Sequence, residues 1–279
     1  MGRVMRVIHF PIAVVLAFVA MSAAADVFYD VPVVTQVQGV VFYRTSLAIS
    51  NLGPRTLMGL NFVYRSPVDN TIQGPQALAT VESLGTFATD DVVEFMKNNS
   101  TMRAVDKTMP LFGTLQVVMS STVDPTDVAV VARTYSPATS GNGTVGIAYV
   151  GRPYSTASQA FTRMTTTVRN GTFGHDGNTR ANLGFVSLGN LPMDLKIQYI
   201  DAATGLSLKT FTLSSAAGHQ LESREVVQLG NIFGDPALAG VSRIIVIVTQ
   251  IGQVQGFSGY AVQLDNTTND GSFFLFTEK

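Results

Sequence analysis

The sequence predicts an all-β protein of two tandem immunoglobulin-like antiparallel β-sandwich domains, each with one short helix. Short segments rich in Val, Ile and aromatic residues recur along the chain, and turn residues such as Gly, Pro and Asn separate them every ~8–12 residues. The segment 43–53 also returns in a degraded form at 180–189. We therefore expect two copies of one unit.

The segment 43–53 is the pattern around which each unit is organised. Tyr43, Thr45, Leu47 and Ile49 alternate with polar or small residues. A period of two sends successive side chains to opposite faces of a sheet. Each copy is therefore predicted to be a strand with one buried face.

The other elements of the first unit follow from the same signals. The turn sequence Asn-Leu-Gly-Pro at 51–54 predicts a hairpin between the two strands that flank it. Asp91 followed by Glu94 resembles a capping box, which predicts a short helix within 89–96. The strands of this unit are expected at residues 27–38, 40–50, 58–65, 77–84, 115–120, 128–135 and 144–150.

The second unit repeats the order of these signals. The segment 195–199 echoes 60–64, and 225–229 echoes the helix start at 91–95. Strands expected at 243–249 and 257–264 match the Val-rich pair of the first unit. A polar stretch containing a proline marks the boundary. We predict a signal peptide at 1–25, a first β-sandwich unit at 26–152 and a second at 153–279.

The apolar faces of these strands are expected to meet in two separate cores. The first core should contain Tyr43, Thr45, Leu47, Ile49, Leu60, Phe62 and Tyr64. The second should contain Leu183, Phe185, Leu195, Ile197 and Tyr199.

The N-terminus has the pattern of a secretory signal. Arg3 and Arg6 precede the apolar run 11–21, and three alanines before Asp26 supply a small-residue cleavage site. The run is about half the ~20 residues that a membrane-spanning helix needs, so we expect no transmembrane segment in the mature chain. The protein is predicted to be exported to the periplasm or the extracellular space. Its lack of cysteine excludes disulfides and suits a bacterial envelope.

Charge and composition exclude two classes of protein. Removing Arg3 and Arg6 from the 18 basic residues leaves 16 against 19 acidic ones, a formal charge of about −3 for the mature chain. No basic patch for nucleic acid is visible, so we expect no nucleic-acid partner. Apolar residues make up 46% and charged residues 13% of the chain, which excludes a disordered protein.

The opening strand and the end of the chain resemble a known group. Segment 43–51, with its Arg-Thr-x-Leu-x-Ile-x-Asn pattern, and segment 260–270, with a Tyr…Asp-Asn…Asp pattern, are similar to exported bacterial proteins of unknown function. The resemblance implies two tandem β-sandwich units and carries no activity with it. The second opening strand has Ser187 where the pattern expects Asn, so the two units do not share any role of Asn51.

Few residues suggest catalysis, and we predict no catalytic residues and no enzymatic activity. Outside the signal the histidines are His175 and His219, both in segments that read as turns or loop edges. His175 could bind a metal or act as a base, but a solvated turn histidine explains it, and a structural role explains His219. No Gly-x-Ser-x-Gly elbow or phosphate-binding glycine loop is present.

Two sets of residues are candidate sites. Asp265, Asn266, Asn269 and Asp270 offer the oxygen ligands that calcium favours, although they lack EF-hand spacing and turn chemistry also explains them. Calcium is accordingly the one cofactor considered, and otherwise none is expected.

Arg44 and Arg180 lie at matched places in the two copies and form the second set. On the polar face of a strand each could bind a carboxylate or a sugar hydroxyl. A structural role, as the cross-strand partner of a polar residue, is the alternative. We expect the two arginines to occupy equivalent positions in the two units.

The function predicted by elimination is that of an exported, non-enzymatic structural or protein-interaction module of the bacterial envelope or extracellular space. The alternative is a module that binds carbohydrate or another envelope ligand through loops at one end of a sandwich or a groove between the units. A serine- or carboxylate-dependent hydrolase is the third hypothesis. The partner, protein or glycan, is left open.

Overall fold

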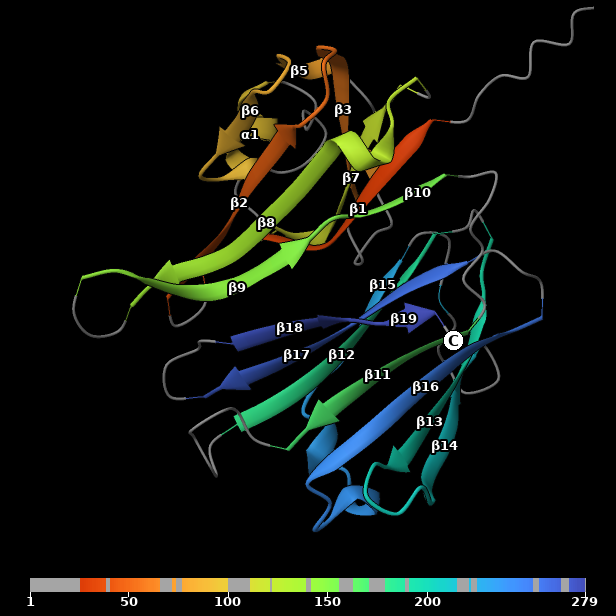
Figure 1. Cartoon of the computed structure of the whole chain (residues 1–279). Helices are drawn as coiled ribbons and strands as arrows, with labels where there is room; N and C mark the ends of the chain where they lie inside the picture. The colour runs from red at the N-terminus through yellow and green to blue at the C-terminus, as the bar shows by residue number, and fades with distance from the viewer. Residues whose placement is uncertain are drawn as a thin grey trace, which may run out of the picture.

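The all-β class predicted from the sequence is confirmed by the computed structural model (Figure 1). The structure describes residues 26–38, 41–65, 72–73, 77–99, 111–120, 122–138, 142–155, 163–170, 179–188, 191–214, 221, 225–252, 256–266 and 271–278. The predicted signal peptide at 1–25 lies outside these residues. Within them, no helix is long and apolar enough to cross a membrane.

The first unit is one large antiparallel sheet folded around a core. Its strands are β1 (Val27–Gln38), β2 (Phe42–Asn51), β3 (Leu57–Arg65), β4 (Ile72–Gln73), β5 (Ala77–Val81), β6 (Thr86–Thr89), β7 (Leu111–Met119), β8 (Val128–Pro137), β9 (Thr144–Val150) and β10 (Arg152–Ser155). The strand order is β4-β3-β7-β1-β2-β8-β9, with β10 on β1, β5 on β3 and β6 on β2. The long β1 joins the two halves, because it pairs with β7 and then, at its end, with β2.

The second unit has two separate sheets around its own core. Its strands are β11 (Arg163–Arg169), β12 (Thr179–Ser187), β13 (Asp194–Asp201), β14 (Ser207–Leu213), β15 (Val226–Leu229), β16 (Arg243–Ile251), β17 (Phe257–Asp265), β18 (Gly271–Leu275) and β19 (Thr277–Glu278). One sheet has the order β14-β13-β16-β11-β19, and the other has the order β15-β12-β17-β18.

The two units repeat the same strand pairing. The order β6-β2-β8-β9 in the first unit corresponds to β15-β12-β17-β18 in the second, and in both a leucine of the second strand lies opposite an alanine of the third: Leu47 opposite Ala132, and Leu183 opposite Ala261. We call residues equivalent when they occupy the same place in this shared pairing.

Backbone hydrogen bonds outside the strand ladders support the equivalence. Gly151 donates to the Val130 carbonyl over 2.8 Å, and Phe276, at the equivalent place, donates to the Gly259 carbonyl over 2.9 Å. Leu52 likewise donates to Asp127 as Leu188 donates to Gly256. Arg44 and Arg180 are equivalent by the same pairing, as the sequence predicted.

The predicted core faces are also found. Leu47, Ile49, Leu60, Phe62 and Tyr64 belong to the core of the first unit. The core of the second unit includes Leu183, Phe185, Leu195, Ile197 and Tyr199. Thr45 is fully buried beside the first core, whereas Tyr43 is only half buried.

The hairpin predicted at 51–54 is wrong. Strand β3 pairs with β4, β5 and β7, whereas β2 pairs with β1, β6 and β8. Both edges of β2 are thus occupied, so the chain crosses to the other half of the sheet. Asn51 fixes this crossing, because its side-chain amide donates to the carbonyls of Arg55 (2.7 Å) and of Val81 in β5 (3.2 Å).

The helix predicted for the second unit is also wrong. In the first unit α1 (Val92–Asn98) begins as expected, with the Asp91 carboxylate accepting from the Glu94 amide over 3.0 Å. Residues 226–229 instead form β15, the equivalent of β6, because Val226 and Val227 pair with β12. Two 3₁₀ turns, η3 (Ile232–Gly234) and η4 (Pro236–Leu238), follow β15 as α1 follows β6. Among the described residues α1 is the one α-helix.

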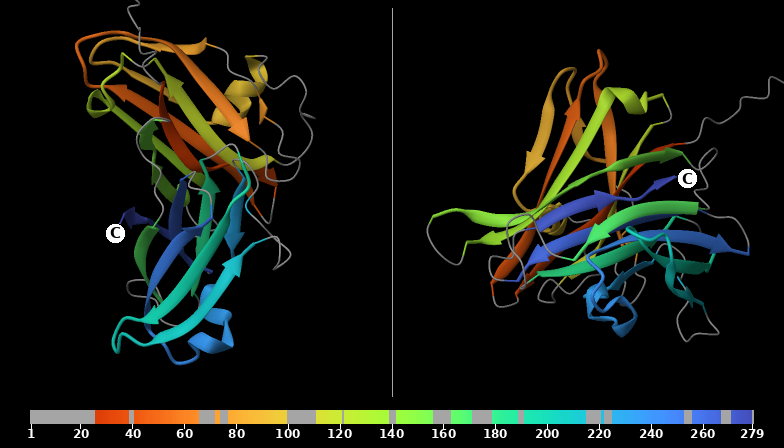
Figure 2. Two further views of the ribbon diagram at one scale, coloured as in Figure 1. Left: turned by 90° about the vertical axis from the view of Figure 1, so that its right-hand side faces the viewer. Right: turned by 60° about the horizontal axis from the view of Figure 1, so that its bottom comes forward.

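The connection between the units begins later than the expected boundary at 152. Residues 152–155 form β10, which pairs with β1 from Val27 to Asp30. The described chain then resumes at β11, the first strand of the second unit. The two units lie against one another, with β9 of the first next to β18 of the second (Figures 1 and 2).

Candidate functional site

A third apolar cluster joins the two units. From the first unit it contains Val33, Ile147 and Tyr149, and from the second it contains Val186, Leu188, Val226, Tyr260 and Val262. The Tyr149 ring meets the Phe273 ring edge to face, with centroids 4.7 Å apart. Arg152 adds a polar contact by donating to the Phe276 carbonyl over 3.2 Å. The cluster covers the outer face of the sheet β15-β12-β17-β18.

Tyr260 lies at the centre of this contact and depends on a glycine. Gly184 is directly opposite Tyr260 in the β12–β17 ladder, and a Cβ atom at Gly184 would lie 1.9 Å from Cζ of the tyrosine ring. The ring therefore lies flat over β12, fully buried, and beside Phe273 at 5.7 Å between centroids. Only a residue without a side chain permits this packing at 184.

The equivalent sheet face of the first unit is exposed. Val131, the equivalent of Tyr260, is 41% exposed, and Val150, the equivalent of Leu275, is 55% exposed. Leu52, the equivalent of the interface residue Leu188, is 59% exposed. We call this surface the open face. It is formed by Ser46, Ala48, Ser50, Leu52, Thr86, Ala88, Ala129, Val131, Ala148 and Val150.

The open face has a distinct chemistry. The residues that define it are small or medium-sized, and they are either apolar or hydroxyl-bearing. Arg133 on β8 also lies on this face and is held at its margin, because its guanidinium donates to the hydroxyl (3.0 Å) and carbonyl (3.2 Å) of Thr144. A partly apolar sheet surface of this kind is suited to protein contact.

Arg44, a predicted ligand residue, borders the open face. Its guanidinium lies 4.9 Å from the centre of the Tyr135 ring, and that of Arg133 lies 5.5 Å from the same ring. The Tyr135 hydroxyl donates to the Asp90 carbonyl over 3.0 Å and so fixes the ring. This cation–π group holds two positive charges beside an aromatic face. Arg44 itself is exposed and remains available to a carboxylate.

Arg180, the equivalent of Arg44, has a different environment. It donates to the side-chain carbonyl of Asn266, one of the predicted calcium ligands. Asp265, the next predicted ligand, is buried beside it, whereas Asn269 and Asp270 lie outside the described residues. No group of three or more His, Cys, Asp or Glu side chains that could hold a metal occurs in the described part of the chain. His175 and His219 also lie outside it.

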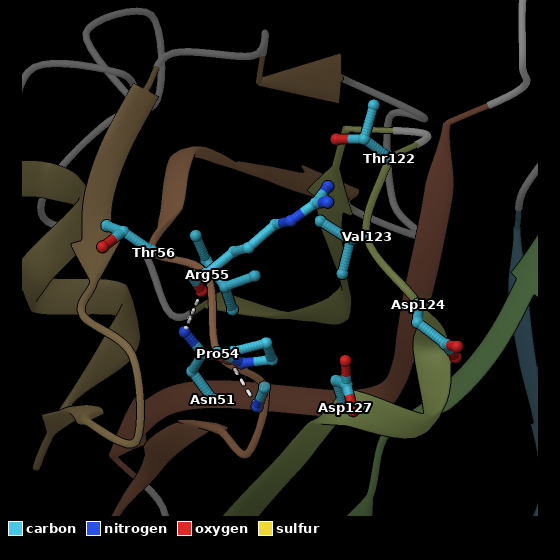
Figure 3. A pocket seen from close by; sticks show the side chains of 10 residues that line it. Asn51, Pro54, Arg55, Thr56, Thr122, Val123, Asp124 and Asp127 are labelled. Carbon is cyan, nitrogen blue, oxygen red and sulfur yellow. Dashed lines mark hydrogen bonds between the residues drawn. The ribbon is translucent and has the colours of Figure 1, made fainter.

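A pocket of about 330 Å³ lies at the loop end of the first unit (Figure 3). Asn51 organises its floor. Besides its bonds to the carbonyls of Arg55 and Val81, its side-chain nitrogen donates to the Glu82 carbonyl over 3.0 Å, and its side-chain oxygen accepts from the Gly53 amide over 3.1 Å. Gly53 packs against Asp127, because a Cβ atom there would lie 2.7 Å from the Asp127 carboxylate. These contacts hold the loops that form the pocket.

Opposite charges line this pocket. In Figure 3 the Arg55 side chain extends toward Thr122 and Val123, while Asp124 and Asp127 lie on another side. Within the described chain the Arg55 guanidinium has no carboxylate partner. The hydroxyl (2.7 Å) and amide (2.9 Å) of Thr126 donate to Asp124 and lower the pKa of its carboxyl group. The pocket can therefore present both signs of charge to a small polar ligand.

Tyr29 supports the pocket from below. Its hydroxyl donates to the Pro125 carbonyl over 2.7 Å and so fixes the turn that carries Asp124 and Asp127. Burial, together with the negative charges of Asp124 and Asp127, raises the pKa of Tyr29 to about 12. The phenol is therefore neutral and acts as a structural donor.

The chain matches no known family model, and no curated protein matches it. The functional interpretation therefore depends on the geometry described above. Sequence reasoning located Arg44 and Arg180 but missed the open face and the pocket. The sequence did contain a signal for the contact between the units. Gly184 and Val186 lie on the side of β12 that faces away from the core, where polar residues are expected, and yet one is small and the other apolar.

Proposed function

We propose that the protein is an exported, non-enzymatic structural or protein-interaction module of the bacterial envelope or the extracellular space, built from two immunoglobulin-like domains. The observation that carries the proposal is the open face. The same sheet face is buried in the second unit, where it forms an apolar contact with the first, and it is uncovered in the first unit. Exposed partly apolar sheet surfaces of this kind mark protein contacts.

Two features favour a partner over a purely structural surface. The two units share an apolar contact, so the open face belongs to a unit that is packed against its neighbour. In addition, Arg44 and Arg133 at its margin attract acidic or aromatic groups and are weakly hydrated compared with lysine. A central apolar patch with a charged rim is the usual composition of a specific interface.

The test is a pull-down from the host envelope with immobilised residues 26–279. We expect a captured protein or glycoconjugate that Val131→Asp no longer retains, because a carboxylate would be desolvated at the centre of the contact. Leu206→Asp is the matched control, since Leu206 is exposed (66%) in a turn of the second unit. Equal capture by both variants would remove the open face from the proposal.

The non-enzymatic part is tested separately. Residues 26–279 are screened against glycosidase, esterase and peptidase substrates together with a His175→Ala, His219→Ala double variant. We expect no turnover by either protein. Turnover that the double variant loses would establish a histidine-dependent enzyme, and turnover that it keeps would direct attention to carboxylates such as Asp265 and Asp270.

The pocket in Figure 3 supports a second candidate function, the binding of a small polar ligand such as a sugar or a zwitterion. Arg55 offers a bidentate donor, and Asp124 and Asp127 offer acceptors or a cation site on the other side. Titration calorimetry with neutral sugars, sugar acids and amino acids tests this. A ligand that binds the wild type and not Arg55→Ala supports it, while unchanged binding to Arg55→Ala contradicts it.

A further inference from the structure

We propose that the open face binds a second copy of this chain, with the second unit of one copy docking on the first unit of the next. The proposal rests on the proposed function and names its partner. Its basis is that the chain already contains this contact once, between its own two units. The first unit contributes Tyr149 to that contact, and the second contributes Tyr260 and Leu188. The residues equivalent to these three, Phe274, Val131 and Leu52, are exposed.

One side of the internal contact is contributed by β9. Tyr149 packs against Phe273, and Ile147 packs over Gly271, where a Cβ atom would lie 3.1 Å from Cδ1 of the isoleucine. The equivalent of Tyr149 in the second unit is Phe274, because Phe274 lies opposite Ala261 as Tyr149 lies opposite Ala132. Phe274 is 38% exposed and belongs to no apolar cluster of the described residues.

The other side of the internal contact is the sheet face of the second unit. Its buried residues Tyr260 and Leu188 have the equivalents Val131 and Leu52 in the first unit. Both equivalents are exposed. The molecule therefore carries an uncovered aromatic knob, Phe274, on β18 of the second unit and an uncovered receiving surface, the open face, on the first unit. The two correspond to the knob and surface that meet inside the chain.

The geometry of such a contact is head to tail. The two surfaces in contact are different, so a bound pair of copies keeps one free surface of each kind. Heterologous contacts of this type extend into open chains unless their rotation closes a ring. A repeat of the internal contact therefore predicts linear assembly, with units that alternate along the fibre.

The contact between copies is expected to be weaker than the internal one. Ser50 takes the place of Val186, Arg133 that of Val262 and Ser272 that of Ile147, so part of the apolar area is lost. The internal contact also benefits from the covalent link, which gives an effective concentration in the millimolar range. We expect assembly that depends on protein concentration and responds to single substitutions.

Sedimentation velocity from micromolar to millimolar concentration, on residues 26–279, is the first test. The wild type should shift to larger species as concentration rises, whereas Val131→Asp and Phe274→Asp should each remain monomeric. Mixing these two variants should give a one-to-one dimer and nothing larger, because each supplies the surface that the other lacks. Leu206→Asp should assemble as the wild type does. Unchanged denaturation midpoints show that the variants are folded.

Cross-linking gives a second test, because a covalent link traps even a contact that the cysteine substitutions weaken. The chain has no cysteine, so a Val131→Cys, Phe274→Cys double variant carries the only thiols. A short bis-maleimide should convert it into a ladder of oligomers and should give the single-cysteine variants at most trace dimers. A Leu206→Cys, Phe274→Cys control should give no ladder.

The outcomes separate this proposal from the proposed function. A wild type that stays monomeric at all concentrations and gives no ladder overturns the second copy as partner. So does a mixture of Val131→Asp and Phe274→Asp that stays monomeric while the wild type assembles, because the contact is then not head to tail. In either case, loss of the captured partner by Val131→Asp in the pull-down would still support the open face as a docking surface.

Discussion

Replacement of Gly184 by alanine should weaken the contact between the two units. The new Cβ atom would lie 1.9 Å from Cζ and 2.1 Å from Cε1 of Tyr260, whereas carbon atoms in contact are ordinarily ~3.5–4.0 Å apart. The ring must therefore move by about 1.5–2 Å, which takes it away from Phe273 and from the β9 residues above it. Because the ring is fully buried, it has no open space to enter.

Two known effects give a lower and an upper limit for the loss of stability caused by Gly184→Ala. Overpacking a buried site costs about 1–3 kcal/mol, and complete loss of a buried aromatic ring costs about 3–5 kcal/mol. Alanine recovers about 0.5–1 kcal/mol through its lower backbone entropy in the unfolded chain. We therefore expect Gly184→Ala to lower the free energy of unfolding by about 2–4 kcal/mol.

The first unit supplies the compensating change. Its equivalents of Gly184 and Tyr260 are Ala48 and Val131, so the Gly184→Ala, Tyr260→Val double variant copies a pair that the fold already accommodates. Urea denaturation should show this variant to be about as stable as Tyr260→Val alone, with a coupling energy of about 1–3 kcal/mol. Tyr260→Phe is the control that keeps the ring. A neutral Gly184→Ala, or strictly additive effects in the double variant, would refute the packing argument.

Three further changes test other parts of the structure. Asn51→Ala removes four hydrogen bonds and should lower the free energy of unfolding by about 2–4 kcal/mol in urea denaturation, while Ser50→Ala should change it little; equal effects would contradict the role of Asn51. Leu84, exposed and with φ of 58°, should stabilise the protein by about 0.5–1 kcal/mol when replaced by glycine, and a lower denaturation midpoint would show that the leucine makes a contact. Because the pKa of Tyr29 is raised to about 12, its contribution to the free energy of unfolding is complete below pH 10 and is lost as the pH rises toward 12. Tyr29→Phe should therefore flatten the alkaline loss of stability measured by denaturation. An identical alkaline profile would contradict this.

The alternation of apolar with polar or small residues was sufficient to locate strands that have one buried and one solvent-exposed face. Leu47 and Ile49 in β2 and Phe62 in β3 are separated by polar or small residues, and each lies in the core that the pattern predicted. The duplication was also visible, because Arg44 and Arg180 each stand three residues before a leucine, Leu47 and Leu183. These features depend on local pattern, which one sequence records well.

Partners across the sheet were not predictable in the same way. The turn at 51–54 has hairpin chemistry, but the choice of β7 rather than β2 as the partner of β3 depends on which edges are already occupied. Likewise the helix expected at 225–229 followed from its likeness to 91–95, whereas pairing of Val226 with Val186 decided the outcome. Tertiary pairing overrides local signals in such short segments.

The surfaces were hardest to see. The pocket combines Arg55 with Asp124 and Asp127 from a loop much later in the chain, and nothing near either loop signals the other. The open face was invisible because its exposure is defined by comparison with the covered face of the second unit. Gly184 was the one local hint, since a glycine inside a strand often marks close approach of another group.

The position of the first strand in each unit has a consequence for the order of folding. Strand β1 lies between β7 and β10, with Val27 opposite Ser155, and β11 lies between β16 and β19, with Met164 opposite Glu278. In each unit the strand that is synthesised first is therefore completed by the residues that are synthesised last. Pairing across such separations is slow, in the range of milliseconds to seconds for β proteins. A nascent chain keeps β1 and β11 open along one edge until β10 and β19 have been made. Contacts that form this late are expected to slow unfolding more than they speed folding.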